Sequence, residues 1–449
     1  MGILDLFRRK AEPARVRSFD GAAGGRRTLG MGHIGRINPE VAAAAPSLRS
    51  RASYLALNNP WLSQACANWT GALVGAGIVP TSKHPDPERR KAINAYFQEW
   101  AADADAEGRT DFWGMQATLA DSMVKAGEAV ALIVNTDDGP RLRIIPSELL
   151  DESKTMELSE DRSIFSGVEL DGNGKRVAYW ITPEKPGNFF ATHAPSVRVD
   201  ASAVLHVFKP LAPGQVRGIS WLAPVILSAG DFDQLCDALL VGAKVAAMHA
   251  GFITDINGTS EDAYAVDQSD VSLEPGTLRR LGVGQDVKFN TPGQLQQVEA
   301  FLKLNLRQLA AGLGLPDHLL SGDLTGANYS SLRAGLLPFR QRVEQVQYGV
   351  LVPQFLAPVL RYVITHGILS GALDAPDFES NPAAYLTAEW LPPKPLQVDP
   401  MKDVQATIAE LDAGLTSRRK AVAERGWNLD DLDSEIASEK PQGAAGETA

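Results

Sequence analysis

Between residues 86 and 126, apolar side chains recur at the spacing of an α-helix. Four of them lie three or four positions apart and so share one helix face: Ile93, Tyr96, Phe97 and Trp100. The preceding Asp86-Pro87-Glu88 is typical of a helix start, with a capping side chain, a first-turn proline and an acid near the positive end of the helix dipole. The pattern predicts a second helix from Asp111 to Ala126.

From Glu128 onward the pattern changes to short apolar runs separated by turn residues. Residues 129–134 and 142–145 flank the turn Asp137-Asp-Gly139, which predicts a strand, a turn and a strand. The same pattern returns on both sides of Asp171-Gly-Asn-Gly174, and residues 204–208 add another short strand. The middle of the chain is therefore predicted to be rich in β-structure.

A long helix is predicted from Ser220, the expected cap, to Ala250, with a length of roughly 45 Å. It carries an apolar stripe and many small residues that let neighbouring helices approach closely. The sequence leaves open whether this helix lies buried in one α-domain or is repeated around a ring. A polar stretch over 251–293 follows, and residues 294–313 return to a helical pattern.

Residues 314–328 read as a loop, because Gly, Pro, Asp and Ser punctuate them. A helix follows, for which Asn328 or Ser330 is the expected cap. Pro338 lies well inside the helical pattern, so the helix is expected to bend or break just before it.

Composition and charge argue against some classes of function. The 449 residues have a net charge of −11 and an isoelectric point of about 5.2, which argues against a protein that grips nucleic acid by neutralising phosphates. Residues 1–51 carry ten basic and four acidic residues, so the acidity lies in the rest of the chain. Residues 1–50 are Arg- and Gly-rich and are expected to form a flexible basic arm, with ordered structure beginning near Arg51. An acidic, frayed tail is expected from Asp430.

Motifs for chemistry are missing from the sequence. The seven histidines are scattered without metal-ligand spacing, and neither Cys66 nor Cys236 belongs to a metal motif. There is no phosphate-binding GxxxxGK[ST] loop. No enzymatic activity, cofactor or metal is therefore predicted. The most apolar region, residues 219–250, is interrupted by charges, so no membrane partner is expected either.

One long segment carries a family resemblance. The run Ser321-Gly-Asp-Leu-Thr-Gly-Ala-Asn-Tyr-Ser-Ser-Leu-Arg-Ala-Gly-Leu-Leu-Pro-Phe-Arg340 closely resembles the signature segment of lambda-family bacteriophage portal proteins. Weaker similarity extends from about Arg51 to about Ala437. It includes residues 58–78, 167–180, 213–218 and 398–404.

The resemblance implies an α+β portal-type subunit with long stem helices, a kinked tunnel helix, a β-rich wing, a small α/β clip and a helical crown. Mapped onto this chain, the expected parts are an arm (1–50), a wing (51–218 with 329–395, which includes the tunnel helix), a first stem helix (219–250), a clip (251–293), a second stem helix (294–313), a tunnel loop (314–328), and a crown with an acidic tail (396–449).

The family implies a structural function in the virion. About twelve copies would form a ring at the portal vertex of the capsid, assembled in the host cytoplasm, through which double-stranded DNA is packaged and ejected. The implied partners are the terminase large subunit, a head–tail connector, the major capsid protein and the scaffold. The rival hypothesis from another class is a soluble cytoplasmic enzyme or binding protein with an unrecognised site.

Two groups of candidate channel residues follow from this resemblance. The loop candidates are Asp317, His318, Asp323, Asn328 and Tyr329. The helix candidates are Arg333, Arg340 and Arg342, which are either ordinary surface charges or contacts to DNA phosphates or to acidic groups of an adjacent copy. Arg340 is also spaced to pair with Glu344 along the helix.

Overall fold

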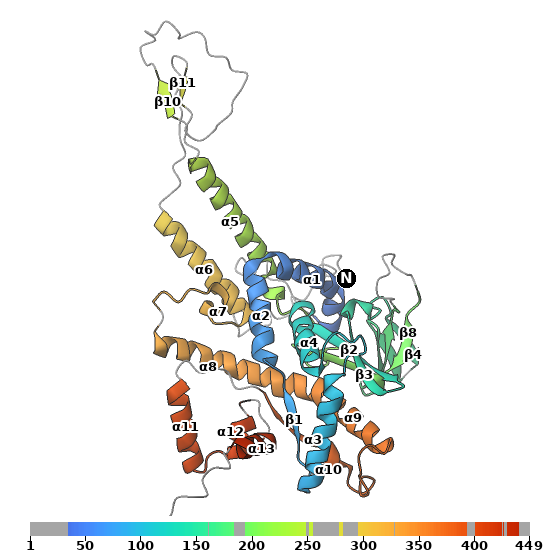
Figure 1. Ribbon diagram of the computed structural model, residues 1–449. Helices are drawn as coiled ribbons and strands as arrows, with labels where there is room; N and C mark the ends of the chain where they lie inside the picture. Colours follow the sequence, from blue (N-terminus) through green and yellow to red (C-terminus); the bar gives the residue numbers. More distant parts are fainter. Residues whose placement is uncertain are drawn as a thin grey trace, which may run out of the picture.

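The computed structural model describes residues 35–159, 161–183, 194–247, 251–254, 278–281, 295–326, 328–392, 400–423, 425 and 429–439. A helical body carries a β-sheet region on one side, and a pair of helices, α5 and α6, projects from it (Figure 1). Smaller helices lie at the end of the body opposite to that projection (Figure 1). The architecture is α+β, as predicted.

Two helices of the body begin at capping aspartates, of which Asp86 is the expected cap. Asp86 accepts a hydrogen bond from the N–H of Glu88, and Asp111 accepts one from the N–H of Gly114. The first four helices are α1 (Ile37–Asn58), α2 (Pro60–Val74), α3 (Pro87–Ala102) and α4 (Phe112–Ala126).

Helix α1 corrects one expected boundary. It starts at Ile37, so residues 37–50 are helical and do not belong to a flexible arm, whereas residues 1–34 lie outside the described part of the chain. Its buried face consists mainly of small side chains, a weak apolar signal that explains why the sequence pattern missed it: Val41, Ala45, Ala52, Leu55 and Ala56.

Strand β2 (Glu128–Thr136) separates two hydrophobic cores. Ala129 and Ala131 face the main core between the helices, and Val130 faces a second core beneath the larger sheet. This arrangement follows from the two-residue period of a strand, which places successive side chains on opposite faces.

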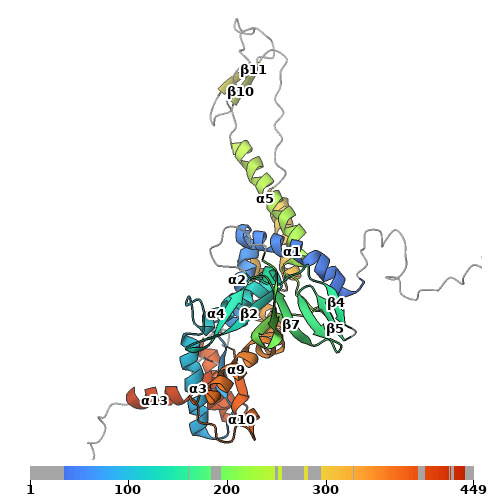
Figure 2. The same ribbon diagram turned by 90° about the vertical axis from the view of Figure 1, so that its right-hand side faces the viewer.

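In the described part of the chain, the strands form four sheets. Strand β2 lies between β3 (Gly139–Ile145) and β9 (Val204–Phe208) in an antiparallel sheet, which confirms the predicted strand–turn–strand unit. The larger antiparallel sheet has five strands in chain order (Figure 2): β4 (Met156–Ser159), β5 (Arg162–Phe165), β6 (Val168–Asp171), β7 (Arg176–Ile181) and β8 (Val197–Asp200). Strands β1 (Val79–Ser82) and β12 (Ala388–Leu391) form an antiparallel pair.

Helices α5 (Ile226–Ala247) and α6 (Leu295–Leu313) project from the body (Figures 1 and 2). The α-helix begins six residues after Ser220, whose hydroxyl accepts the N–H of Leu222 and opens a tighter turn instead of capping α5. At the far end of the projection, β10 (Gly251–Thr254) and β11 (Leu278–Leu281) pair in parallel. The other residues of the expected clip lie outside the described part.

Helix α8 (Tyr329–Val346) continues through Pro338, so the helix does not break there, whereas the expected bend stays a prediction. Pro338 and Ala334, the residue whose carbonyl loses its partner, are both exposed, and water can satisfy that carbonyl. The irregular part comes later, as a π-helical segment, η7 (Gln347–Leu356), which leads into α9 (Ala357–Leu369).

The π-helical segment places two glutamine side chains against neighbouring elements. The Gln347 amide donates to the carbonyl of Leu73 over 2.8 Å, and the Gln354 amide oxygen accepts the N–H of Phe208 over 2.9 Å. The continuous run Ser330–Leu369 has the length and composition of a membrane span, but Phe355 and Leu356 on it are buried in the main core, as in a core helix.

The C-terminal part forms short helices: α10 (Pro382–Leu386), α11 (Pro400–Asp412), α12 (Arg418–Ala423) and α13 (Leu429–Glu439). Helix α13 corrects the expectation of a frayed tail from Asp430. It is joined to α12 by an ion pair in which Arg418 Nη1 lies 3.0 Å from Asp433 Oδ2.

The close approach of Gly218 to the start of β2 gives a first prediction. A Cβ at Gly218 would lie 2.3 Å from the carbonyl oxygen of Gly127, so Gly218→Ala is expected to lower the free energy of unfolding by about 3 kcal/mol. A Cβ at the helical Gly71 meets nothing within 4 Å, so Gly71→Ala should leave stability unchanged or raise it by up to about 1 kcal/mol. Urea unfolding of both variants tests this, and equal stabilities would contradict it.

Candidate functional site

The segment 314–328 connects α6 to α8 and carries most of the predicted channel residues. Gly314 has a positive φ of 71°, and the N–H of Leu315 bonds the carbonyl of Ala310, so α6 ends in a glycine cap. The segment is not wholly a loop, because Asp317–Ser321 form the short helix α7, which Gly322 ends with a φ of 70°.

Three side chains fix the base of this segment to the body. The Trp69 indole N–H donates to the carbonyl of Leu313 over 3.0 Å, and the Asn68 amide donates to the carbonyl of Leu319 over 2.5 Å. Arg342 Nη1 on α8 donates to the carbonyl of Gly314 over 2.7 Å. Arg342, predicted to contact DNA or another subunit, therefore has a partner within its own chain.

The two acidic loop candidates pair with basic residues of α6. Asp317 Oδ2 lies 3.3 Å from Arg307 Nε, and Asp323 Oδ2 lies 3.2 Å from Lys303 Nζ. Hydrogen bonds from Thr325, followed by the contact with Lys303, lower the pKa of Asp323 to about 2. These partly exposed ion pairs are individually weak, but they neutralise the acids of the segment.

Asn328 caps α8, as predicted. Its side-chain oxygen accepts the N–H of Ser331 over 2.8 Å, and the Ser331 hydroxyl accepts the N–H of Asn328 over 3.0 Å, which together form a capping box. Tyr329 is the first residue of α8. His318 lies half-buried in α7, where its backbone carbonyl accepts the N–H of Gly322.

The remaining arginines lie on one side of α8. Arg333 and Arg340 are seven positions apart, almost two full turns, so they share a helix face that Arg342 does not. Arg333 is exposed and Arg340 half-buried. In the described part of the chain no ion pair joins Arg340 to Glu344, although the spacing suggested one, and Glu344 is exposed to solvent.

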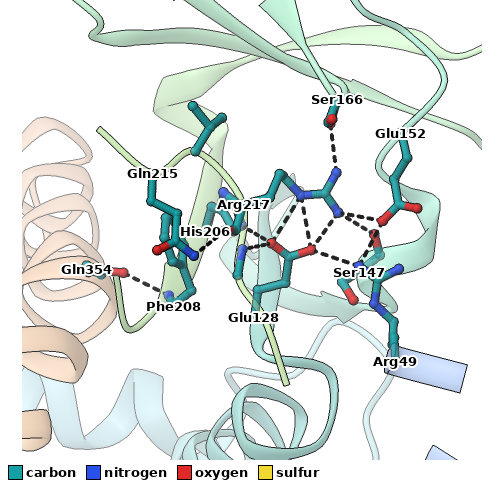
Figure 3. Close-up of polar contacts among 12 residues, drawn as sticks. Arg49, Glu128, Ser147, Glu152, Ser166, His206, Phe208, Gln215, Arg217 and Gln354 are labelled. Atoms are coloured by element: carbon teal, nitrogen blue, oxygen red, sulfur yellow. Dashed lines mark hydrogen bonds and ion pairs between the residues drawn. The ribbon is translucent and has the colours of Figure 1, made fainter. Parts of the chain in front are cut away.

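A second polar site, the charge cluster, lies buried at the base of α5 (Figure 3). Its centre is Glu128, the first residue of β2, whose side chain is 0% exposed. Arg217 Nε lies 3.0 Å from both Glu128 carboxylate oxygens, and Arg49 Nη2 of α1 lies 3.2 Å from one of them. Glu152 approaches Arg217 and Arg49 at 3.2 and 2.8 Å, which balances the two positive charges.

The charge cluster also holds backbone groups of several elements. Glu128 accepts the N–H of Gly218 over 2.7 Å, and Arg217 Nη1 donates to the carbonyl of Ser166 over 2.7 Å (Figure 3). His206 of β9 places Nε2 3.0 Å from Glu128. The cluster thus joins α1, both main sheets and the segment that enters α5.

Burial and pairing act in opposite directions on these groups. Burial by itself would raise the pKa of Glu128, but the charge of Arg217 and the hydrogen bond from His206 outweigh it and hold that pKa well below its usual range. Burial lowers the pKa of His206 more than Glu128 raises it. Glu128 is therefore ionised, and the neutral His206 donates its Nε2–H to it.

Sequence reasoning did not identify the charge cluster. Glu128 and Arg217 are 89 positions apart, and neither belongs to a motif of local spacing. The available signal was indirect: Arg217 lies between Gly214 and Gly218 in the segment Pro213-Gly-Gln-Val-Arg-Gly218, which resembled the portal family.

The fold and these sites define a structural subunit, and comparison with known proteins specifies its class. Residues 25–347 match the profile "Phage portal protein, lambda family", and the chain belongs to that family. It is thus a portal protein, a structural subunit of the head–tail connector in a tailed phage or phage-like particle.

Several curated portal proteins are similar in sequence. The chain is 26% identical to the probable portal protein of Halomonas phage phiHAP-1 over 96% of this chain and 87% of that protein. It is 23% identical to the portal protein of Escherichia phage N15 over 61% of this chain and 58% of that protein. It is 22% identical to portal protein B of Escherichia phage lambda over 61% of this chain and 57% of that protein.

Solved structures with a related chain trace include a chain from the neck of an empty gene transfer agent particle. Its TM-score is 0.43 at 16% identity, over 85% of this chain and 93% of that chain. An HK97-family portal protein from Corynebacterium diphtheriae has a TM-score of 0.31 at 14% identity, over 74% of this chain and 93% of that chain.

The charge cluster predicts a large effect of removing one partner. Arg217→Ala leaves the Glu128 carboxylate buried without its main counter-charge and is expected to cost about 3–5 kcal/mol of unfolding free energy. Arg418→Ala, which breaks the exposed pair with Asp433, is the matched control and should have a much smaller effect. Urea unfolding measures both, and a similar small loss in the two variants would show that the cluster is not stabilising.

The charge cluster also predicts acid sensitivity. Glu128 and His206 both have lower pKa values folded than unfolded, so the unfolded chain binds more protons, and the stability they give is lost as pH falls. Between neutral pH and pH about 5, His206 is expected to contribute a loss of about 1 kcal/mol per pH unit.

His206→Gln removes this titration and keeps a polar side chain. Its unfolding free energy should therefore depend less on pH over that window, whatever its absolute value. If the unfolding free energy of this variant depended on pH as steeply as that of the unmodified protein, His206 would be excluded as the origin of the acid sensitivity.

Proposed function

We propose that about twelve copies of this chain form a ring at the portal vertex of the capsid, assembled in the host cytoplasm. Double-stranded DNA passes through the ring during packaging and ejection. The ring docks the terminase large subunit and a head–tail connector protein, and it contacts the major capsid protein and the scaffold. Membership of the lambda portal family supports this assignment.

In this proposal the segment 314–328 faces the channel and contributes Asp317, His318, Asp323 and Asn328, and Tyr329 follows directly after it. The observation that carries it is the anchoring of the segment at its base by Trp69 and Arg342. Its acids are neutralised by α6, so the segment presents paired charges. Such a surface favours passage of DNA over tight binding of its phosphates.

The proposed ring also gives a partner to apolar surface on the projecting helices. Leu240 and Val241 on α5, and Phe301 and Leu304 on α6, are each more than half exposed in the single chain. A neighbouring copy in a ring would cover such side chains through a head-to-tail interface.

The other parts follow the map from the sequence. Residues 219–250 and 294–313 form the stem, and residues 251–293 form the clip. The wing consists of residues 51–218 with 329–395, and residues 396–449 form the crown and tail. Because α1 begins at Ile37, we extend the wing to include residues 37–50.

Arg333 and Arg340 share one face of α8, and we propose that they contact DNA phosphates or acidic groups of an adjacent copy. Arg342 is assigned to holding the channel segment in place. We assign no catalytic function, in keeping with membership of a family of structural proteins.

Electron microscopy of the purified protein, with light scattering for mass, tests the ring. Rings with a central hole and a mass of about twelve chains are expected. A population that stays monomeric with capsid and scaffold proteins present would reject the proposal.

The anchoring of the channel segment can be tested separately in a DNA-packaging assay. Arg342→Ala removes the hydrogen bond to Gly314, so we expect rings that form normally but package several-fold less DNA. Arg361→Ala removes an exposed arginine of α9 and is the matched control, expected to package normally. Packaging by Arg342→Ala at the level of the control would remove Arg342 from the mechanism.

A further inference from the structure

A cavity of about 650 Å³ opens beside the turn between β6 and β7. Three segments distant in sequence meet there: the β6–β7 hairpin, the first turn of α1 and the loop that contains Gly214. Its polar lining side chains are Asn38, Asn173, Lys175, Arg176, Tyr179 and Gln215. Neither the portal family nor the channel segment accounts for it.

The cavity carries positive charge without a compensating acid. Lys175 is exposed and Arg176 half-buried, and no ion pair reaches either of them from the described residues. The nearest acid in sequence, Asp171, uses a carboxylate oxygen to accept the backbone N–H groups of Asn173 and Lys175 over 3.0 and 2.8 Å. Arg176 already lies over the ring of Phe208, with its guanidinium carbon 5.2 Å from the ring centroid, a contact that leaves its charge unneutralised. Both cations thus keep their charge for an anionic ligand, in a protein whose net charge is −11.

Tyr179 supplies a neutral donor inside the cavity. The residue is 3% exposed overall, but its hydroxyl oxygen still reaches solvent at the cavity wall, and it has no hydrogen-bond partner within the described chain. Burial raises the pKa of Tyr179 to about 12, so the phenol keeps its proton at neutral pH and can donate it.

The polar groups that α1 and the Gly214 loop bring to the lining are already bonded. The Asn38 amide donates to the carbonyl of Gly214 and accepts the N–H of Val216, and Gln215 Nε2 donates to the carbonyl of Arg217. Asn38 lies in the first turn of α1, where the carboxylate of Glu40 offsets the positive end of the helix dipole, so the positive charge of the cavity rests on Lys175 and Arg176.

We propose that this cavity binds a carboxylate of an acidic peptide segment from a partner protein. An arginine and a lysine at the rim, with a phenol O–H deeper in, match a carboxylate that enters from an extended chain. A peptide is favoured over duplex DNA for two reasons. The phenol lies recessed, where a side chain or chain end can reach but duplex phosphates cannot. The five-stranded sheet also lies across the helical body from α6 and the channel segment (Figure 1).

Calorimetric titration of the purified protein with a short polyglutamate peptide tests the proposal. Lys175→Ala and Arg176→Ala should each weaken binding about tenfold, which corresponds to about 1.4 kcal/mol. Tyr179→Phe removes only the hydroxyl and should weaken binding about threefold to tenfold. Lys91→Ala, which removes an exposed lysine of α3, is the matched control and should bind like the unmodified protein.

Two controls make the outcome decisive. Lys175 lies exposed in a turn, so its variant is expected to melt at the unmodified temperature, which separates lost binding from lost folding. The peptide is then replaced by a short DNA duplex and by inorganic phosphate. Failure of the peptide to bind, equal affinity of all variants, or a response of these residues to the duplex or to phosphate alone would each overturn the proposal. Binding is measured on the subunit, so the result does not depend on ring formation.

Discussion

The burial of the Glu128 carboxylate constrains the structure around it more than any local sequence preference does. An ionised carboxylate without solvent is stable only when charged and polar donors surround it, and here Arg217, Arg49, His206 and the N–H of Gly218 do so. These donors come from α1, from β9 and from the segment that enters α5. The requirement to satisfy one carboxylate therefore fixes the first helix, both main sheets and the entry to α5 relative to one another.

The same constraint explains the glycines beside the charge cluster. Gly127 has a φ of 92°, and a Cβ there would lie 2.0 Å from the carbonyl carbon of Ile219. The chain that leaves Arg217 must pass against the start of β2 to bring the N–H of Gly218 to Glu128, and a side chain at either glycine would block it. Helix α5 thus starts from a rigid base although most of its length projects from the body (Figure 2).

The sequence predicted elements whose signals are local. Asp86 was identified as a cap, and Asn328 as one of two candidates, because a cap depends on the residues of the next turn. The hairpins were identified because turn residues separate apolar runs. The charge cluster could not be predicted, because a pair separated by 89 positions leaves no periodic trace. Helix α1 was missed because half of its buried residues are alanine and one is Arg49, which leaves a weak apolar stripe. Pro338 does not end α8, because water can reach the carbonyl that it leaves without a partner.

The placement of charge follows one physical logic in the interior and another on the surface. Glu128 is paired because burial makes an unpaired charge costly. Asp317 and Asp323 are paired where water partly reaches them, so their ion pairs add little stability, and their main effect is to neutralise the acids of the segment 314–328. Lys175 and Arg176 follow neither pattern, because they border a cavity and have no acid partner in the described chain. In an acidic protein, leaving two cations unpaired around a buried phenol preserves their attraction for an external anion, and pairing them would abolish it.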